Sequence, residues 1–190
     1  MNRTRFLRNM LGLGLFSTLG CRVDNGKAAS TDDLTSSEAD KLREELIAAW
    51  HRSESMTMTN VKQMPSEFFI FKYTDEAMTF SEQWRHCVIY TCGQLAARLG
   101  IVNPYENVKL PVQMSKEDVI KELENMYLFV RRSIKELSEE KLFSECEFAG
   151  KTIPVWRLFY AMENHIIHHR GQCVVYLRLN GVVPKGFYGW

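Results

Sequence analysis

Residues 155–179 read VWRLFYAMENHIIHHRGQCVVYLRL, and this stretch decides the fold that we expect for the chain. Its apolar side chains recur every three to four residues, which is typical of an amphipathic helix. Pro154 precedes the stretch and suits a first helical turn, and Asn180-Gly181 follows it as a helix end. The stretch therefore predicts one long helix of the kind that builds helical bundles.

Two further helices carry start signals in the sequence. Thr79 and Glu82 have the spacing of a capping box, in which the threonine caps the backbone and the glutamate caps back, so a helix is predicted over residues 80–99. It should stop at the glycine that follows. Ser115 is a similar start signal for a helix whose apolar residues continue to Leu137.

A fourth helix is expected at the start of the folded part, near Ser36. Its apolar residues keep helical spacing into the 50s, but the methionine-rich stretch before Pro65 leaves its end open. Residues 148–153 predict a turn flanked by short extended pieces. Four long helices with two long connections predict an all-α protein, a four-helix bundle.

The first residues have the layout of an export signal. Arg3, Arg5 and Arg8 form a basic region, and the apolar run at residues 10–19 is too short to span a bilayer. The Leu-Gly-Cys ending resembles the lipobox of bacterial lipoproteins, so we expect Cys21 to be lipidated and to become the mature N-terminus. The alternative is an ordinary cleaved signal or a hydrophobic N-terminal tail.

Three parts are expected along the chain: a signal segment at residues 1–21, a polar flexible tether at 22–37 and a folded domain at 38–190. The protein is accordingly expected in the cell envelope, where it touches the membrane only through its lipid anchor. It would be cytoplasmic if the signal were not used. The chain has 24 Lys and Arg against 23 Asp and Glu, so its charge gives no reason to expect nucleic-acid binding.

Four cysteines follow the signal, and no two of them form a CxxC pair: Cys87, Cys92, Cys146 and Cys173. This spacing is typical neither of a disulfide framework nor of a zinc knuckle. Buried free thiols are the expected state.

The histidines near the C-terminus are the strongest indication of chemistry. His165 and His169 are four apart, so on a helix one imidazole stands above the other, on a stripe shared with Leu158, Met162 and Tyr176. Neutral imidazoles buried in such a stripe have unsatisfied ring nitrogens unless a partner occupies them. A divalent metal ion would be such a partner, and hydrogen-bonded core histidines are the alternative.

A third ligand has to come from another helix. His86 is the candidate, because the helix predicted over residues 80–99 is apolar or small on two sides, whereas His51 lies at a polar helix end. Three imidazoles leave a coordination position open for water or substrate, which is typical of a catalytic ion. Imidazole suits zinc, nickel, copper or iron.

Other residues are expected beside the ion and not on it. Tyr90 and Tyr176 are placed as pocket-lining donors, and His168 lies on the flank of its helix as a surface or second-layer residue. Gln172 is expected to make structural contacts in the same region. Glu163 lies about a turn from the ligands but on a neighbouring face, which makes it a poor general base.

A set of residues near the C-terminus is shared with a known family: His165, His169–Gln172, Tyr176–Arg178 and Gly181–Pro184. Together with the lone His86 in the second helix, they resemble the signature of the DinB-like proteins over about residues 38–188. The resemblance implies a bundle with an up-down-down-up course, a three-histidine site for nickel, zinc or a similar ion, and frequent homodimers. Characterised relatives include thiol-dependent transferases and isomerases that use bacillithiol or mycothiol.

The leading hypothesis is a metal-dependent hydrolase or thiol-dependent transferase that acts on a small electrophilic substrate, with nickel or zinc as the ion. The alternative is an envelope protein that binds a metal or a ligand without catalysis. A metal-free bundle that serves as an interaction domain is a third hypothesis.

Overall fold

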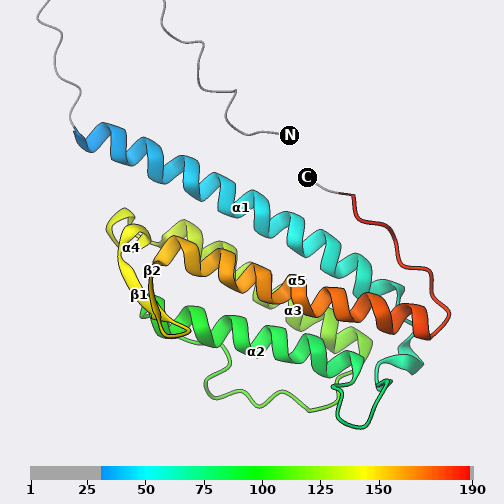
Figure 1. Cartoon of the computed structure of the whole chain (residues 1–190). Helices are drawn as coiled ribbons and strands as arrows, with labels where there is room; N and C mark the ends of the chain where they lie inside the picture. The colour runs from blue at the N-terminus through cyan, green and yellow to red at the C-terminus, as the bar shows by residue number, and fades with distance from the viewer. Residues whose placement is uncertain (1–30, 189–190) are drawn as a thin grey trace, which may run out of the picture. The chain divides into compact units, whose positions relative to one another are not determined.

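The computed structural model describes residues 31–188, with side chains from Glu38 onward. Four long helices form the bundle: α1 (Thr31–Gln63), α2 (Phe80–Leu99), α3 (Lys116–Glu136) and α5 (Val155–Leu179). The smaller elements are the 3-10 helix η2 (Ser66–Phe68), the short helix α4 (Glu139–Phe143) and the strands β1 (Glu145–Phe148) and β2 (Lys151–Pro154). The expected all-α fold is confirmed (Figure 1). The expected signal at 1–21, with Cys21, lies outside the described residues.

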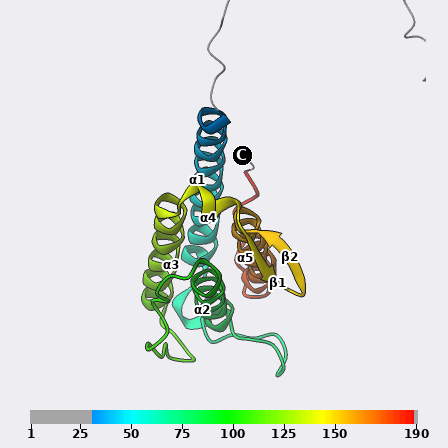
Figure 2. The same cartoon turned by 90° about the vertical axis from the view of Figure 1, so that its left-hand side faces the viewer.

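The helices follow an up-down-down-up course, because α1 and α5 run in one direction and α2 and α3 in the other (Figure 1). The connection at residues 100–115 therefore returns along the length of the bundle before α3 begins. Helices α1 and α2 each pack against both α3 and α5, so they occupy opposite corners when the bundle is seen end-on (Figure 2). Helices α2 and α5, which carry the candidate histidines, are therefore direct neighbours.

The helix ends that the sequence predicts are found at their expected residues. Thr79 Oγ1 accepts from the Glu82 backbone N–H at 3.2 Å, and the Glu82 carboxylate accepts from the Thr79 N–H at 2.7 Å. Gly100 ends α2 in the left-handed region with φ 72°. Ser115 caps α3, and Gly181 follows α5 with φ 75°. The capping box and the glycine stops are thus confirmed.

Helix α1 differs from the expectation at its start. It begins at Thr31, so residues 31–37, expected in the tether, are helical. The sequence offers several polar candidates for an N-cap between Ser30 and Ser37, and local capping preference alone does not choose among them. At its other end α1 continues to Gln63 because the methionine-rich stretch packs into the core, where Met58 and Met64 are buried.

A short helix and a hairpin fill the connection between α3 and α5. Ser138 caps α4, which the sequence analysis did not predict. Strands β1 and β2 pair antiparallel around Ala149 and Gly150, with φ 51° and 73°, the two positive values that a two-residue hairpin turn requires. The turn flanked by extended pieces is confirmed. Pro154 ends β2 and caps α5 instead of lying inside its first turn.

Helix α2 is buried on the side that faces the bundle interior. Trp84, Val88 and Leu95 are at most 1% exposed, and the aromatic ring of Trp84 meets Phe80 edge-on. The four described cysteines are all free thiols, as expected; Cys146 is half-buried and the other three are buried. Among the described residues, no helix combines the length and the hydropathy that crossing a bilayer requires.

Candidate metal centre

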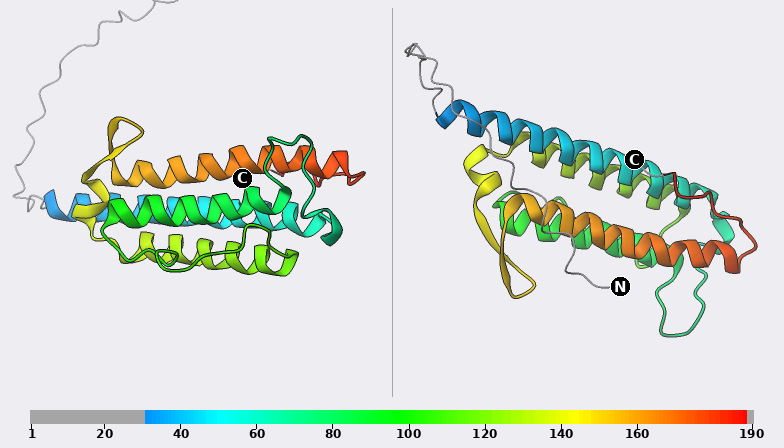
Figure 3. Two further views of the ribbon diagram at one scale, coloured as in Figure 1. Left: turned by 90° about the horizontal axis from the view of Figure 1, so that it is seen from below. Right: turned by 45° about the horizontal axis from the view of Figure 1, so that its top comes forward.

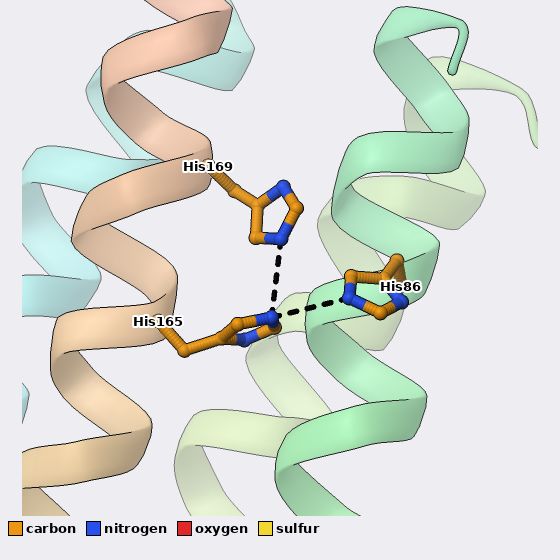
Figure 4. A group of neighbouring side chains, drawn as sticks. All are labelled: His86, His165 and His169. Atoms are coloured by element: carbon orange, nitrogen blue, oxygen red, sulfur yellow. Dashed lines mark hydrogen bonds between the residues drawn. The ribbon is translucent and has the colours of Figure 1, made fainter. Parts of the chain in front are cut away.

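Three histidines from two helices point toward one another at the α2–α5 contact (Figure 4). His165 Nε2 lies 3.1 Å from His86 Nε2 and 3.1 Å from His169 Nε2. One ring nitrogen from each of the three lies within 4.8 Å of the other two. The structure therefore brings together the three side chains that the sequence singled out.

The helical repeat and the packing of α2 on α5 produce this convergence. His165 and His169 are one turn apart on α5, so their imidazoles stand one above the other, with ring centroids 4.5 Å apart. Their stripe also carries Met162 and Tyr176, both fully buried, which keeps this face of α5 against the bundle. His86 reaches the same point because α2 packs alongside α5.

The three rings are held as neutral imidazoles. Burial, with a smaller contribution from the neighbouring histidines, lowers the pKa of His165 and of His169 to about 4. Burial also lowers the pKa of His86 below its ordinary value. At neutral pH each ring therefore has an unprotonated nitrogen, which is the form that binds a metal ion.

Two of the three distances between these nitrogens fit a common ion. Two nitrogens bound to a zinc-sized ion at about 2.1 Å, with an angle of roughly 95 to 109° between them, lie about 3.1 to 3.4 Å apart. The two Nε2–Nε2 distances of 3.1 Å fall at the short end of this range. His169 Nδ1 lies 2.5 Å from Gln83 Oε1, an acceptor, so it carries the proton and Nε2 keeps its lone pair for the site. The three histidines could thus hold a metal ion.

The group that could hold an ion is made of histidines only. Within residues 38–188, no carboxylate and no thiol belongs to it. A divalent ion bound there would keep its two positive charges uncompensated by protein ligands. The centre would therefore favour an anionic fourth ligand.

Tyr90 is the predicted pocket residue that lies directly beside the histidines. Its ring centroid is 4.5 Å from that of His165 and 5.5 Å from that of His86, both in tilted arrangements. The Tyr90 ring therefore packs against two of the three candidate ligands, His86 and His165.

The other three predicted neighbours make hydrogen bonds beside the three histidines. His168 is exposed, and its Nε2 is 2.7 Å from the Gln172 side-chain nitrogen. Tyr176 is buried and donates its hydroxyl hydrogen to the backbone carbonyl of Met78 at 2.5 Å. His168 is not in the group of candidate ligands.

Glu163 and Arg170 face α1 and not the histidines. Burial raises the pKa of Glu163, while the charge of Arg170 and a hydrogen bond with Ser53 oppose the rise. Arg170 donates to the Ser53 carbonyl and to Thr57 Oγ1, both at 3.3 Å. The contacts of Arg170 connect α5 to α1. Glu163 lies on the same side of α5, so it is poorly placed to act as a general base at the histidines, as its helical position predicts.

Gln83 is a site residue that the sequence analysis missed. It is 3% exposed, and its side chain joins His169 to Gln172 and Tyr176. A signal for it was available, because Gln83 stands three residues before His86 and so lies one turn away on the same face of α2.

Comparisons with known proteins agree with this architecture. The model of the DinB family matches residues 35–190. A solved DinB-like protein from Bacillus cereus aligns with TM-score 0.64 at 20% identity, and one from Bacillus subtilis with TM-score 0.62 at 18% identity. Each alignment covers 76% of this chain and 97% of the other, and at such identity the likeness shows the fold alone. No curated protein matches the chain in sequence.

Proposed function

The chain belongs to the DinB family, and from that premise we propose that it is a metal-dependent enzyme whose nickel or zinc ion is held by His86, His165 and His169. The observation that carries the proposal is the convergence of three neutral imidazole nitrogens at the α2–α5 contact. A set of three protein ligands is typical of catalytic ions, because a further coordination position stays available to water or substrate.

The proposed reaction is the attack of water or of a thiol on a small electrophilic substrate. When bound, the ion supplies Lewis-acid chemistry that favours the deprotonated form of either nucleophile near neutral pH. The chain contributes an all-histidine set without a carboxylate among its described members, which preserves the positive charge that draws an anion. His86 and His165 are only partly buried, so small molecules can reach them from solvent.

Surrounding elements support a substrate site at this face. The β1–β2 hairpin and the segment that precedes α2 project on the same side of the α2–α5 pair (Figure 3). Tyr73 in that segment packs against Tyr176 of α5 with ring centroids 5.4 Å apart. With Tyr90 beside His165, aromatic surface is available to position an apolar substrate group.

Binding without catalysis is the second candidate function. Tyr90 favours it, because its ring lies against two of the three candidate ligands and covers part of their surroundings. A covered ion would be retained or sequestered and would not meet a substrate. The same purified protein distinguishes the two functions.

We expect full-length protein, purified without chelator, to contain about one equivalent of nickel or zinc by elemental analysis, because three nitrogens converge on one point. Removal of the ion with a chelator should lower hydrolysis of p-nitrophenyl acetate, or thiol conjugation of 1-chloro-2,4-dinitrobenzene, by more than about tenfold. Readdition of the ion should restore the rate. Bound metal without either activity supports the binding function, and less than about 0.1 equivalent after metal loading contradicts both.

We also propose that the protein is exported and lipid-anchored, on the basis of the N-terminal sequence alone. Arg3, Arg5 and Arg8 precede an apolar run that leads to Cys21. Intact-mass measurement of protein from membranes should give a chain that begins at Cys21 and carries acyl mass. A chain that retains Met1 would contradict export.

A further inference from the structure

Gln83 occupies the centre of a hydrogen-bonded chain that begins at a candidate metal ligand. Its Oε1 lies 2.5 Å from His169 Nδ1. Its Nε2 donates to Gln172 Oε1 at 3.0 Å and also lies 3.5 Å from the Tyr176 hydroxyl oxygen. The chain continues from Gln172 Nε2 to His168 Nε2 over 2.7 Å and so reaches the surface of α5.

A backbone carbonyl determines which group donates and which accepts in this series of hydrogen bonds. The Met78 carbonyl can only accept, so the Tyr176 hydroxyl must donate to it across 2.5 Å. The Tyr176 oxygen is then an acceptor toward Gln83, which turns the amino end of that amide to Tyr176 and Gln172. The carbonyl end of Gln83 therefore faces His169, where it can only accept.

The result is one defined tautomer at His169. A proton on Nδ1 leaves the Nε2 lone pair directed at His165 Nε2, 3.1 Å away, and hence at the point where the three nitrogens converge. The other neutral tautomer would put an N–H at that point and would leave Nδ1 facing the Gln83 oxygen without a hydrogen. Gln83 is nearly completely buried, at 3% exposure, so water is not available to replace its contacts.

We propose that Gln83 is a positioning residue that, anchored through Tyr176 on the Met78 carbonyl and through Gln172, holds His169 in the tautomer that presents Nε2 to the metal ion. The proposal rests on the proposed metal-binding function. It assigns to an amide the role that a carboxylate or a backbone carbonyl has beside many metal-binding histidines.

Two substitutions of Gln83 separate this role from simple packing. Gln83→Met keeps the volume and removes the acceptor, so we expect the affinity for nickel or zinc to fall about 10- to 100-fold, measured by competition with a chromophoric chelator. Gln83→Glu keeps an acceptor for His169 Nδ1, and the Gln172 amide can turn to donate to it. Its affinity should stay within about threefold of the wild type or increase.

If Gln83 only packed, Gln83→Met should bind the metal ion more tightly than Gln83→Glu, because a buried methionine is tolerated better than a buried carboxylate. Gln94→Met on the same helix is the matched control, since Gln94 is only half-buried, and it should leave the affinity unchanged. Circular dichroism should show that all three variants keep their helicity. The proposal would be overturned if Gln83→Met bound the metal ion as tightly as the wild type does. It would also be overturned if Gln83→Met bound the ion more tightly than Gln83→Glu.

The tautomer can be measured without metal. Nitrogen-15 NMR of the metal-free wild type should show His169 protonated on Nδ1, and Gln83→Met should show a shift toward protonation on Nε2. A wild-type His169 protonated on Nε2 would overturn the role of Gln83 even if the protein binds metal. Conversely, the Nδ1 tautomer in a protein that takes up no metal would leave the positioning role standing and contradict the proposed function.

Discussion

In a His165→Ala variant we expect the affinity for the divalent ion to fall by about a hundred- to a thousandfold. Structural zinc sites gain roughly 10 to 16 kcal/mol over four ligands, so one ligand is worth about 2.5 to 4 kcal/mol. His165 is the histidine chosen for the test, because its Nε2 lies 3.1 Å from each of the other two. The measurement is chelator competition on metal-loaded protein, with elemental analysis of the purified variant.

The fold should survive this substitution. Alanine is the best helix former, and removal of a partly buried imidazole also removes a group whose Nδ1 has no hydrogen-bond partner. His51→Ala is the matched control, because the His51 side chain is 60% exposed and lies on α1, outside the candidate group. It should bind the ion as the wild type does. Unchanged binding in His165→Ala, or metal lost together with helicity, would contradict the assignment of a site.

Trp84→Ala is the substitution expected to lower the stability of the fold strongly. Trp84 is completely buried on α2, two residues before His86, and its loss should lower the free energy of unfolding by about 3 to 5 kcal/mol through lost burial and the cavity that remains. Its indole Nε1 is buried without a partner, so removal of that group offsets part of the loss. Urea denaturation of the metal-free protein, followed by circular dichroism, gives the value.

Phe187→Ala provides the comparison for this core substitution. Phe187 is 81% exposed, so truncation of its ring should change the free energy of unfolding by no more than about 0.5 kcal/mol. If Trp84→Ala costs less than about 1 kcal/mol under the same conditions, the side of α2 that carries Trp84 does not form the core.

The two histidines of α5 could be predicted from the sequence because both positions belong to one helix. The spacing of His165 and His169 places them on one stripe, and the apolar residues of that stripe show that it faces inward. His86 required a further step, since the sequence predicts only that its helix is buried on two sides, whereas in the structure His86 and Tyr90 are half-buried and Ala97 is exposed. The packing of α2 on α5 supplies the contact that this step assumes.

The position of Gln83 one turn from His86 could be predicted from the sequence, but its hydrogen bond to His169 could not. Its side chain meets a histidine 86 positions later in the chain, and its orientation depends on the Met78 carbonyl through Tyr176. No local pattern encodes a hydrogen bond that exists only after two helices and a loop have packed together. The start of α1 was missed for a related reason, because several polar residues satisfy the same capping preference equally well.

The sequence by itself determined the four long helices, both ends of α2, the bundle class and the ligand pair on α5, since these depend on the period of one helix and on backbone capping. The sequence named His86 and Tyr90 as candidates, but only the tertiary structure shows that they meet the α5 histidines and that Gln83 contacts His169. The physical reason is that the helical repeat assigns each side chain to a face, whereas close packing between helices selects which faces meet.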